Sequence, residues 1–486
     1  MRSLSKAAPA ALALALGACA AVGPNFKSPT APVVSSYGMA GDAAPGDVVL
    51  SPDKRSAGAW WRDLGSRRLN AVIEQALADN QTVAAALAAL DKAREQAASV
   101  RGGMAPRVDA NASVQGERIN LTGFGFTAIP GIPAISNPTI SLLSVGANVT
   151  YDLDLFGGQR RRLETAQAAT EAAAHRADAA YLTLTGNVAM AALKIAAIRA
   201  QIGAVQAIIA DDERNLDIVL KALDAGGEAP AAATSRRAQI AADQALLPPL
   251  AQDLALARHY LAVLVGKPPA EWTAPDFDVA EFAPPAQIPV TLPSALVRNR
   301  PDILAAEADL HADTARIGVA TADLYPDIKL NAGFAQSAVT PWGLFSYNAT
   351  GWNVGPALTM PIFNGGALRA DKRAAEAQAR ASLAMYRQTV LTAFTQVSDV
   401  LAALAHDDDR LTALGAAQQA ADKALADARA AYSLGGGPLA NVVEAQRQVD
   451  RARLDVVQAQ TQKLLDIVQL YAATATDWRD PATGRP

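Results

Sequence analysis

The chain has 486 residues, of which 51% are apolar, 19% are charged and only 5% are aromatic. This length is ample for one or two large hydrophobic cores, and the low charge excludes a disordered chain. Its 43 basic and 47 acidic residues give a formal net charge of −4, so we expect no nucleic acid partner. A single cysteine, Cys19, excludes an internal disulfide framework and a thiolate-rich zinc site, and we expect no metal site.

The first residues have the pattern of a secretory signal peptide. Two basic residues precede an apolar run over 7–16, which is about half of the ~20 residues that a membrane-spanning helix needs. The run leads into Leu16-Gly17-Ala18-Cys19, which resembles a bacterial lipobox. We therefore predict a signal peptide over 1–18 and a covalent lipid on Cys19; the alternative is a plain signal peptide with an incidental cysteine. Ala20, in place of the aspartate that retains many lipoproteins in the inner membrane, implies the outer membrane.

The rest of the chain divides into an arm and two similar halves. From Phe156 to Gly226 is 70 positions and from Phe363 to Gly435 is 72, and the segments around these landmarks are alike. A tandem duplication explains this match. The predicted boundaries are a lipidated extended arm over 19–59, a first repeat over 60–266, a linker over 267–292, a second repeat over 293–472 and a tail over 473–486.

Each half contains two stretches in which apolar and polar residues alternate. Val145, Ala147 and Val149 are interleaved with small or polar neighbours, for example. Such alternation is typical of strands with one apolar and one polar face. The stretches are joined by loops rich in Gly, Pro, Phe or Thr, so we predict β-hairpins over 106–156 and 326–363.

Long alanine-rich helices follow the hairpins. The segments 159–225 and 367–434 contain 67 and 68 residues without proline, and at ~1.5 Å per residue each would reach about 100 Å, longer than a globular core. The shorter segments 231–265 and 438–471 show heptad spacing of small and apolar residues, typical of coiled-coil seams. Pro248 and Pro249 predict a kink in the first of them.

Two further features of the helical segments concern charge and proline. A helix is predicted over 293–325, and Arg300-Pro301-Asp302-Ile303 within it is interpreted as a helix start with an architectural role. The carboxylate clusters Asp211-Asp212-Glu213 and Asp407-Asp408-Asp409 are interpreted as solvated helix faces. We find no catalytic constellation and do not expect an enzyme.

Four strands with an apolar face on a secreted chain predict a membrane β-barrel, because backbone groups in lipid must all be paired. Four strands cannot close a barrel, so other chains must supply the missing strands. A barrel of eight strands would need two chains and one of twelve would need three. The heptad faces also exceed what one chain can bury, which again indicates an oligomer.

Six short segments, in order along the chain, carry a family resemblance. They are Val22-Gly23-Pro24-Asn25-Phe26, Trp60-Trp61-Arg62-Asp63-Leu64, Tyr151-Asp152-Leu153-Asp154-Leu155-Phe156-Gly157, Arg300-Pro301-Asp302-Ile303, Pro361-Ile362-Phe363-Asn364-Gly365-Gly366 and Tyr432-Ser433-Leu434-Gly435. With these motifs the chain resembles the TolC-type outer membrane factors, specifically the NodT-like lipoprotein branch of RND efflux systems. The resemblance implies a mixed α+β membrane fold: a homotrimer with one twelve-stranded outer membrane β-barrel, four strands per chain, continuous with a twelve-helix periplasmic α-barrel.

The same resemblance implies a function. It predicts a passive trimeric duct in the outer membrane, lipid-anchored and extending into the periplasm, that docks onto a periplasmic adaptor and an inner membrane RND-type pump. The duct would export small toxic compounds: drugs, metals or metabolites. The alternatives are the outer membrane channel of a type I protein secretion system and a structural trimeric coiled-coil envelope lipoprotein, against which the hairpins argue. No cofactor is implied apart from the lipid on Cys19.

The resemblance also places the periplasmic end of the duct. Tyr432-Ser433-Leu434-Gly435 matches the periplasmic turn of the second coiled coil, and the positions that line the aperture are Asn441 and Glu444. Asn441 departs from the acid of the best-known member, so we expect one carboxylate ring, from Glu444; alternatively Glu444 is a solvated acid favoured by the helix dipole. A latching arginine is matched by Gly437, so that latch is absent or relocated. The predicted adaptor-contact tips are Gly226, Gly227, Gly435, Gly436 and Gly437.

Overall fold

The computed structural model describes residues 21–474 apart from 33, 35, 40, 42–47, 51–58, 121–138, 284–287 and 291–292. The predicted signal peptide over 1–18, Cys19 and the tail from 475 onward lie outside these residues. The chain divides into two compact units. Unit 1 contains residues up to Ser28, Asp91–Glu171 and Glu307–Ala384; unit 2 contains Pro29–Leu90, Ala172–Ala306 and Met385 onward.

The two units do not coincide with the two predicted repeats. Each unit takes segments from both 60–266 and 293–472, and apart from the division after Ser28 the boundaries fall inside helices rather than in linkers. The tandem duplication itself therefore stays a prediction. The helices that contain these divisions are α3 (Gln81–Gly103), α4 (Gly158–Asp224), α8 (Pro301–Ala322) and α9 (Ala367–Ser433).

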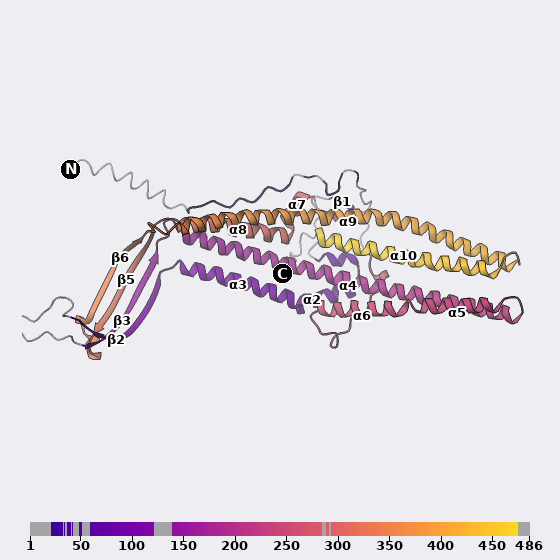
Figure 1. Ribbon diagram of the computed structural model, residues 1–486, viewed down its shortest axis with the longest axis horizontal. Helices are drawn as coiled ribbons and strands as arrows, with labels where there is room; N and C mark the ends of the chain where they lie inside the picture. Colours follow the sequence, from indigo (N-terminus) through magenta and orange to yellow (C-terminus); the bar gives the residue numbers. More distant parts are fainter. Residues whose placement is uncertain are drawn as a thin grey trace, which may run out of the picture. The chain divides into compact units, whose positions relative to one another are not determined.

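Unit 1 contains a four-stranded antiparallel sheet in the order β2-β3-β5-β6 (Figure 1). Its strands are β2 (Arg107–Arg118), β3 (Thr139–Asp152), β5 (Asp327–Ala338) and β6 (Thr350–Thr359). β2 and β3 lie in the hairpin predicted over 106–156, and β5 and β6 in that predicted over 326–363. Central pairing of β3 with β5 joins the two hairpins into one sheet. Among the described strands, β2 and β6 each have a neighbour on one side only.

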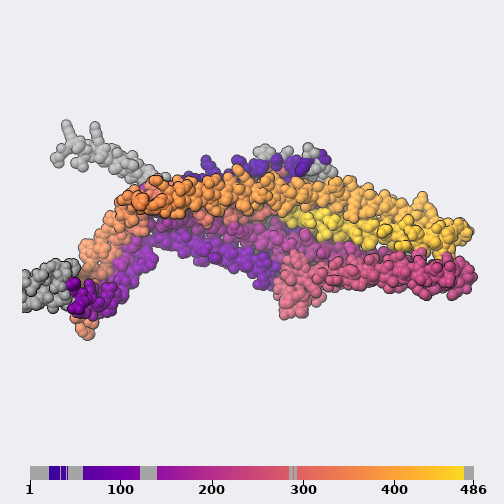
Figure 2. Space-filling view, in the orientation of Figure 1, coloured from indigo at the N-terminus to yellow at the C-terminus, as the bar shows by residue number. Residues whose placement is uncertain are grey.

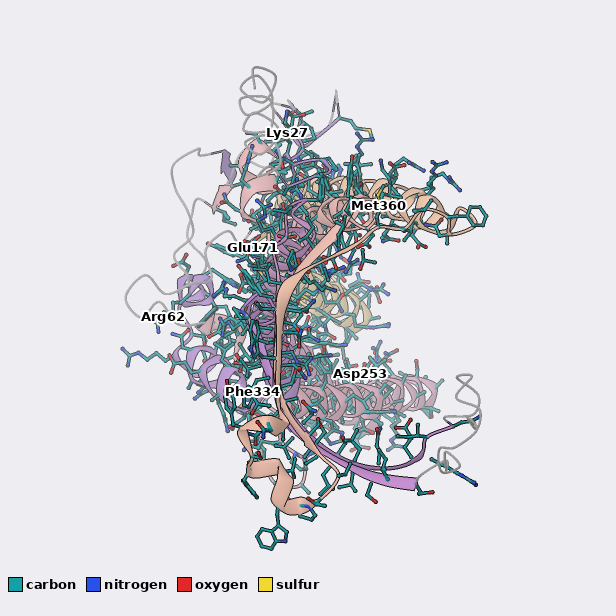
Figure 3. The ribbon with its side chains drawn as sticks, turned by 90° about the vertical axis from the view of Figure 1, so that its left-hand side faces the viewer. Lys27, Arg62, Glu171, Asp253, Phe334 and Met360 are labelled. Atoms are coloured by element: carbon teal, nitrogen blue, oxygen red, sulfur yellow. The ribbon has the colours of Figure 1, made fainter. Side chains whose placement is uncertain are left out.

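The register places apolar and polar residues on opposite faces of this sheet. Val149 of β3 lies opposite Val108 of β2 and Ala332 of β5. One residue earlier in β3, Asn148 lies opposite Asp109 and Gly333. Successive side chains of a strand point to opposite faces, so these two rows define an apolar face and a polar face. The sheet is curved, as Figure 3 shows around the labelled Phe334 of β5.

Unit 2 is helical, and its core contains buried aromatic residues. The five-residue turn η1 (Trp60–Leu64) places Trp60, only 1% exposed, against Tyr471 of α10 (Leu439–Thr474), with ring centroids 5.4 Å apart. The Ser66 hydroxyl then caps α2 (Arg67–Asp79) by accepting a hydrogen bond from the Leu69 N–H at 3.2 Å. The motif that begins with Trp60 thus anchors the segment before α2 to the end of α10.

Prolines divide two of the predicted helices. The helix expected over 231–265 has the predicted kink: it is interrupted at Ala245-Leu246, between α5 (Pro230–Gln244) and α6 (Leu247–Leu264), and both of these residues keep right-handed helical backbone angles. Pro248 and Pro249 have no N–H to continue the ladder, and both occupy the first turn of α6, where no such donor is needed. In the same way, the helix expected over 293–325 is divided before Pro301.

The remaining elements are short. α7 precedes α8, and two three-residue strands pair in parallel, with Val48 opposite Ile288. The bounds are β1 (Val48–Leu50), β4 (Ile288–Val290), α7 (Pro293–Asn299), η3 (Val279–Glu281), η4 (Pro341–Phe345) and η5 (Tyr347–Ala349).

The Trp60–Tyr471 contact generates a stability prediction. Trp60→Ala removes a fully buried ring, so it should lower the free energy of unfolding by ~3–5 kcal/mol. Urea unfolding followed by circular dichroism measures this loss. Tyr260→Ala is the control because Tyr260, an aromatic residue of α6 in the same unit, is 50% exposed and should cost much less. Equal losses from the two substitutions would contradict the assignment of Trp60 to the core.

Candidate functional site

Each long helix, α4 or α9, is followed by a tight turn and then by a helix that runs back beside it, α5 or α10; we call α5 and α10 the returning helices. The two turns have the same construction. After α4, the Gly226 N–H donates to the Leu223 carbonyl at 2.9 Å and the Gly227 N–H to the Ala222 carbonyl at 2.8 Å. After α9, Gly435 and Gly436 repeat this pattern, with distances of 3.1 and 2.9 Å. Gly226 and Gly435 have φ of +77° and +75°, a region that favours glycine, and they end each helix cleanly.

The two helical pairs that these turns close, α4 with α5 and α9 with α10, pack against each other in unit 2. Figure 2 shows them side by side at the end that contains the two glycine turns, which we call the tips. A buried cluster joins Val219 of α4, Ala233 of α5 and Leu425 of α9 to Val443 and Val449 of α10. The residues of the predicted aperture and tips therefore belong to one packed body.

The structure places Asn441 and Glu444 on one exposed face of α10, while Val442 and Val443 point into the cluster. The Glu444 side chain is 63% exposed, and its Oε2 lies 3.7 Å from Nη1 of Arg447, one turn further along. Both predicted aperture residues are thus available to a neighbouring molecule. Arg447 was missed from the sequence, although its i,i+3 spacing from Glu444 was a usable signal.

A buried amide links the two helical pairs. Gln446 of α10 accepts a hydrogen bond from Nη2 of Arg429 in α9 at 2.8 Å. Its own Nε2 donates to Oδ2 of Asp211 in α4 at 3.2 Å and to Oδ1 of Asp450 at 3.0 Å. This Gln446 cross-link connects three helices from both pairs. A polar residue on the buried side of a heptad helix is the sequence signal that could have revealed it.

The two carboxylate clusters are not entirely solvated, which corrects the sequence interpretation. Asp212 is 1% exposed and Asp407 is 8% exposed, whereas their neighbours Glu213 and Asp409 are exposed. Burial, and next the facing carboxyl of Asp243, raises the pKa of Asp212 to about 6. Burial, and next the facing carboxyl of Asp466, likewise raises the pKa of Asp407 to about 6. The packing of the returning helix over one side of each cluster causes the difference.

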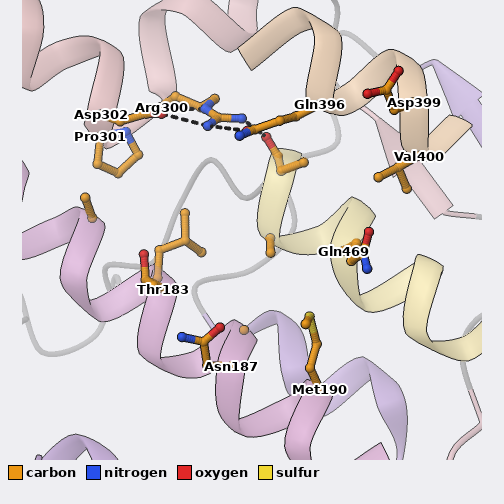
Figure 4. Close-up of a pocket in the computed structure, with 15 residues that line it drawn as sticks. Thr183, Asn187, Met190, Arg300, Pro301, Asp302, Gln396, Asp399, Val400 and Gln469 are labelled. Atoms are coloured by element: carbon orange, nitrogen blue, oxygen red, sulfur yellow. Dashed lines mark hydrogen bonds and ion pairs between the residues drawn. The ribbon is translucent and has the colours of Figure 1, made fainter. Parts of the chain in front are cut away.

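Unit 2 also contains a cavity of about 490 Å³, lined by α4, α9, α10 and the start of α8 (Figure 4). Arg300 borders it, and each of its side-chain nitrogens is engaged. Nε and Nη2 donate to the Asp302 carboxylate at 3.0 and 2.7 Å, Nη2 also to Gln396 at 2.9 Å, and Nη1 to the Ala473 carbonyl at 3.0 Å. Arg300 thus ties the start of α8 to the end of α10, as an architectural motif would.

The segment just after Cys19 is fixed on unit 1. Arg161 of α4 is buried and donates from Nε to the Val22 carbonyl at 3.0 Å and from Nη2 to Oδ1 of Asn25 at 2.7 Å. Phe26 stacks on His311 of α8 with ring centroids 4.4 Å apart. The motif that begins at Val22 therefore serves to attach the arm. Within the described ranges, no three His, Cys, Asp or Glu side chains lie close enough to hold a metal ion.

Comparisons with known proteins cover nearly the whole chain. The profile of the outer membrane efflux protein family matches residues 72–267 and 292–476. The chain is 28% identical over 482 residues to nodulation protein T of Rhizobium leguminosarum bv. viciae, covering 99% of this chain and 95% of that protein. It is 30% identical over 436 residues to the pyoverdine export outer membrane protein OpmQ of Pseudomonas aeruginosa, covering 87% and 88%.

Solved structures agree with this placement. The outer-membrane channel OprN superposes with a TM-score of 0.82 at 28% identity, covering 94% of this chain and 99% of that chain. The predicted resemblance to TolC-type channels is thereby confirmed, as is the outer membrane efflux function that it implied. Because the family profile spans most of the sequence, the chain belongs to the outer membrane efflux protein family.

Proposed function

We propose that three copies of the chain form the outer membrane duct of a tripartite efflux system, in which the duct itself is passive. The amphipathic sheet of unit 1 carries this proposal. Its outer strands β2 and β6 lack a partner on one side among the described strands, and an unpaired edge is not tolerated in lipid. Three copies would contribute twelve strands and close one barrel, and their long and returning helices would form a twelve-helix tunnel in the periplasm.

The distribution of charge supports a membrane position for the sheet. From residue 330 to residue 368, a stretch that includes most of β5 and all of β6, there is no charged side chain. The connection between these strands exposes Trp342, Phe345 and Tyr347. Aromatic side chains are enriched where a barrel meets the headgroup region. The apolar face would contact lipid and these aromatic residues would lie at the membrane boundary.

The polar face would line the lumen. Its middle consists of neutral groups, and its charged residues, such as the paired Arg107 and Asp109, lie toward the ends of the strands. Asn148 donates from Nδ2 to Oδ1 of Asn111 at 3.1 Å, bridging β3 and β2. A Cβ atom at Gly333 would lie 2.5 Å from the Asn353 Oδ1, so a side chain there would displace this amide. A wall of amides and hydroxyls hydrogen-bonds water and discriminates little between cations and anions.

The cargo would be set by the inner membrane partner. Relatives of similar identity are named for different exports: a pyoverdine export protein at 30% and a cation efflux system protein, CusC of Escherichia coli O157:H7, at 25%. Small toxic compounds, whether drugs, metals or metabolites, would arrive from an RND-type pump. A periplasmic adaptor would dock on the tip turns around Gly226-Gly227 and Gly435-Gly436-Gly437.

Glu444 and Asn441 would form the aperture at the periplasmic end. In a trimer, three copies of Glu444 would converge, each accompanied by its own Arg447 at 3.7 Å. The ring would therefore contain guanidinium groups as well as carboxylates, and its preference for cations would be weaker than three isolated acids give. Gly437 supplies no latch, and the Gln446 cross-link would hold the two helical pairs together instead.

The proposed function is tested by the oligomeric state and by substitutions on the two faces of one strand. In detergent, the protein should have three times the mass of one mature chain, which is below the 50.3 kDa of the full sequence because the signal peptide is removed. It should also form conducting channels in planar bilayers. Val354→Arg, on the apolar face of β6, should reduce assembled trimer, with a cost of ~2–4 kcal/mol near the bilayer midplane. Asn353→Arg, its neighbour on the polar face, is the matched control and should change conductance only. A monomer, or equal damage from both changes, would refute the barrel.

Ion selectivity tests the aperture. Glu444→Gln should lower the ratio of cation to anion permeability in single-channel recordings, because a negative ring is removed. Arg447→Gln should raise the same ratio, because the partner cation is removed from an intact ring. Trimer assembly should be preserved in both variants. If selectivity changed in neither, Glu444 would be a solvated acid of the first helical turn.

Acylation of Cys19 is tested by mass spectrometry of the mature amino-terminal peptide, which should show a lipid-modified cysteine. Cys19→Ser should abolish the modification and reduce delivery to the outer membrane. Heat-stable trimers should still form from the delivered fraction, because the barrel rather than the lipid holds the chain in the bilayer. A mature amino terminus at any residue other than Cys19 would show that the segment is a plain signal peptide.

A further inference from the structure

Each helical pair of unit 2 contains one buried carboxyl that faces a second carboxyl on the returning helix. In the first pair, Asp212 of α4 faces Asp243 of α5. In the second pair, Asp407 of α9 faces Asp466 of α10. Asp212 and Asp407 are both buried. Two carboxylates in contact repel each other unless a proton lies between them.

The hydrogen bonds around the two pairs have the same arrangement. Nε2 of Gln239 donates to both oxygens of Asp243 at 3.1 and 3.0 Å, and Nε2 of Gln462 donates to both oxygens of Asp466 at 3.2 and 3.1 Å. In each case the glutamine stands four residues before the aspartate. The acid on the returning helix is therefore held in place as an acceptor.

The acids on the long helices have no such donor. Both carboxyl oxygens of Asp212 and the Oδ2 of Asp407 are buried without a hydrogen-bond partner. A buried acceptor without a donor is costly. A single proton on one carboxyl of each pair would turn that oxygen into a donor and satisfy the contact.

Some charged groups near the two pairs lower the pKa of the buried acids, and others raise it. Arg236 of α5 and Arg447 of α10 favour ionised Asp212, whereas Asp243 opposes it. Asp450 of α10 is a further buried acid next to this pair: burial, and then Asp211 and Asp243, raise its pKa against the effects of Gln446 and Arg453. Around Asp407, Arg410 favours ionisation, and Asp408 and Asp466 oppose it. Asp408 is itself paired with Lys463 of α10. The raised pKa values of Asp212 and Asp407 show that these cations do not outweigh burial and the facing acid.

We infer that Asp212–Asp243 and Asp407–Asp466 are proton-binding sites that hold each returning helix against its long helix when a proton is shared and loosen it when the proton is lost. The inference goes beyond the proposed function, since it rests on contacts inside one chain. Its consequence for transport rests on the proposed duct, where three copies would supply six such sites. Asp212 lies 14 residues before Gly226, so the first site is the nearer to its tip turn.

The direction of the pH effect follows from the raised pKa values. An acid whose pKa is higher in the packed state than in the open state stabilises packing fully below its ordinary pKa of 3.8, and this stabilisation is lost as the pH rises through about 6. The helical pairs should therefore be tightest in acid and looser at neutral pH.

Hydrogen exchange on the full-length trimer tests this. After correction for the intrinsic rate, amides of α5 and of the matching part of α10 should lose about tenfold in protection between about pH 5 and about pH 8, because one pKa unit corresponds to a factor of ten. In Asp212→Asn and Asp407→Asn, an amide that always donates replaces the shared proton. In these variants, the amides of α5 and α10 should stay protected from exchange over the whole of this pH range.

The matched controls are Glu213→Gln and Asp409→Asn, which lie on the same helices within two residues and are exposed. They should retain the wild-type pH response. Infrared spectra should also show protonated carboxyl groups at about pH 5 that are absent from the double variant Asp212→Asn/Asp407→Asn. A pH response that persists in that variant, or no difference in the carboxyl band, would overturn the inference. Trimer mass and conductance, measured in the same samples, report separately on the proposed duct.

Discussion

The constraint on which the rest of the structure depends is that backbone N–H and C=O groups in lipid must all be paired within protein. Among the strands that the structure describes, β3 and β5 have neighbours on both sides, but β2 and β6 have one each. A sheet of this kind is incomplete as a membrane element until other copies cover its edges. In the proposed duct, assembly is therefore part of the fold, and the helices of each chain would follow the symmetry of the barrel.

The features that follow from local chemistry could be predicted from the sequence. Alternation around Val149 gives both the strand and its two faces, because the strand period is two whatever the partner. The absence of proline over 159–225 and 367–434 predicts helices that the structure places at Gly158–Asp224 and Ala367–Ser433. Glycines after these segments predict where the chain turns, since Gly226 and Gly435 adopt positive φ.

The features that depend on which helix packs on which could not be predicted. Asp212 and Glu213 are adjacent in sequence, yet one is buried and the other exposed, because only packing decides which side of α4 is covered. The Gln446 cross-link needs Arg429 and Asp211 from two other helices.

The two ends of the unit 2 core differ in composition, and the difference indicates where the packing of the helices is most easily loosened. Near Trp60 and Tyr471, large buried rings stabilise the fold whatever the pH. Around the tips, the buried cluster is smaller and contains valine, leucine and alanine side chains in place of aromatic rings, so each side chain buries less area. Polar contacts therefore contribute a larger share of what holds the helical pairs closed there, and those contacts include Asp212 and its facing carboxyl. A small change in protonation or in docking would act first on the tips, while the aromatic core would stay intact.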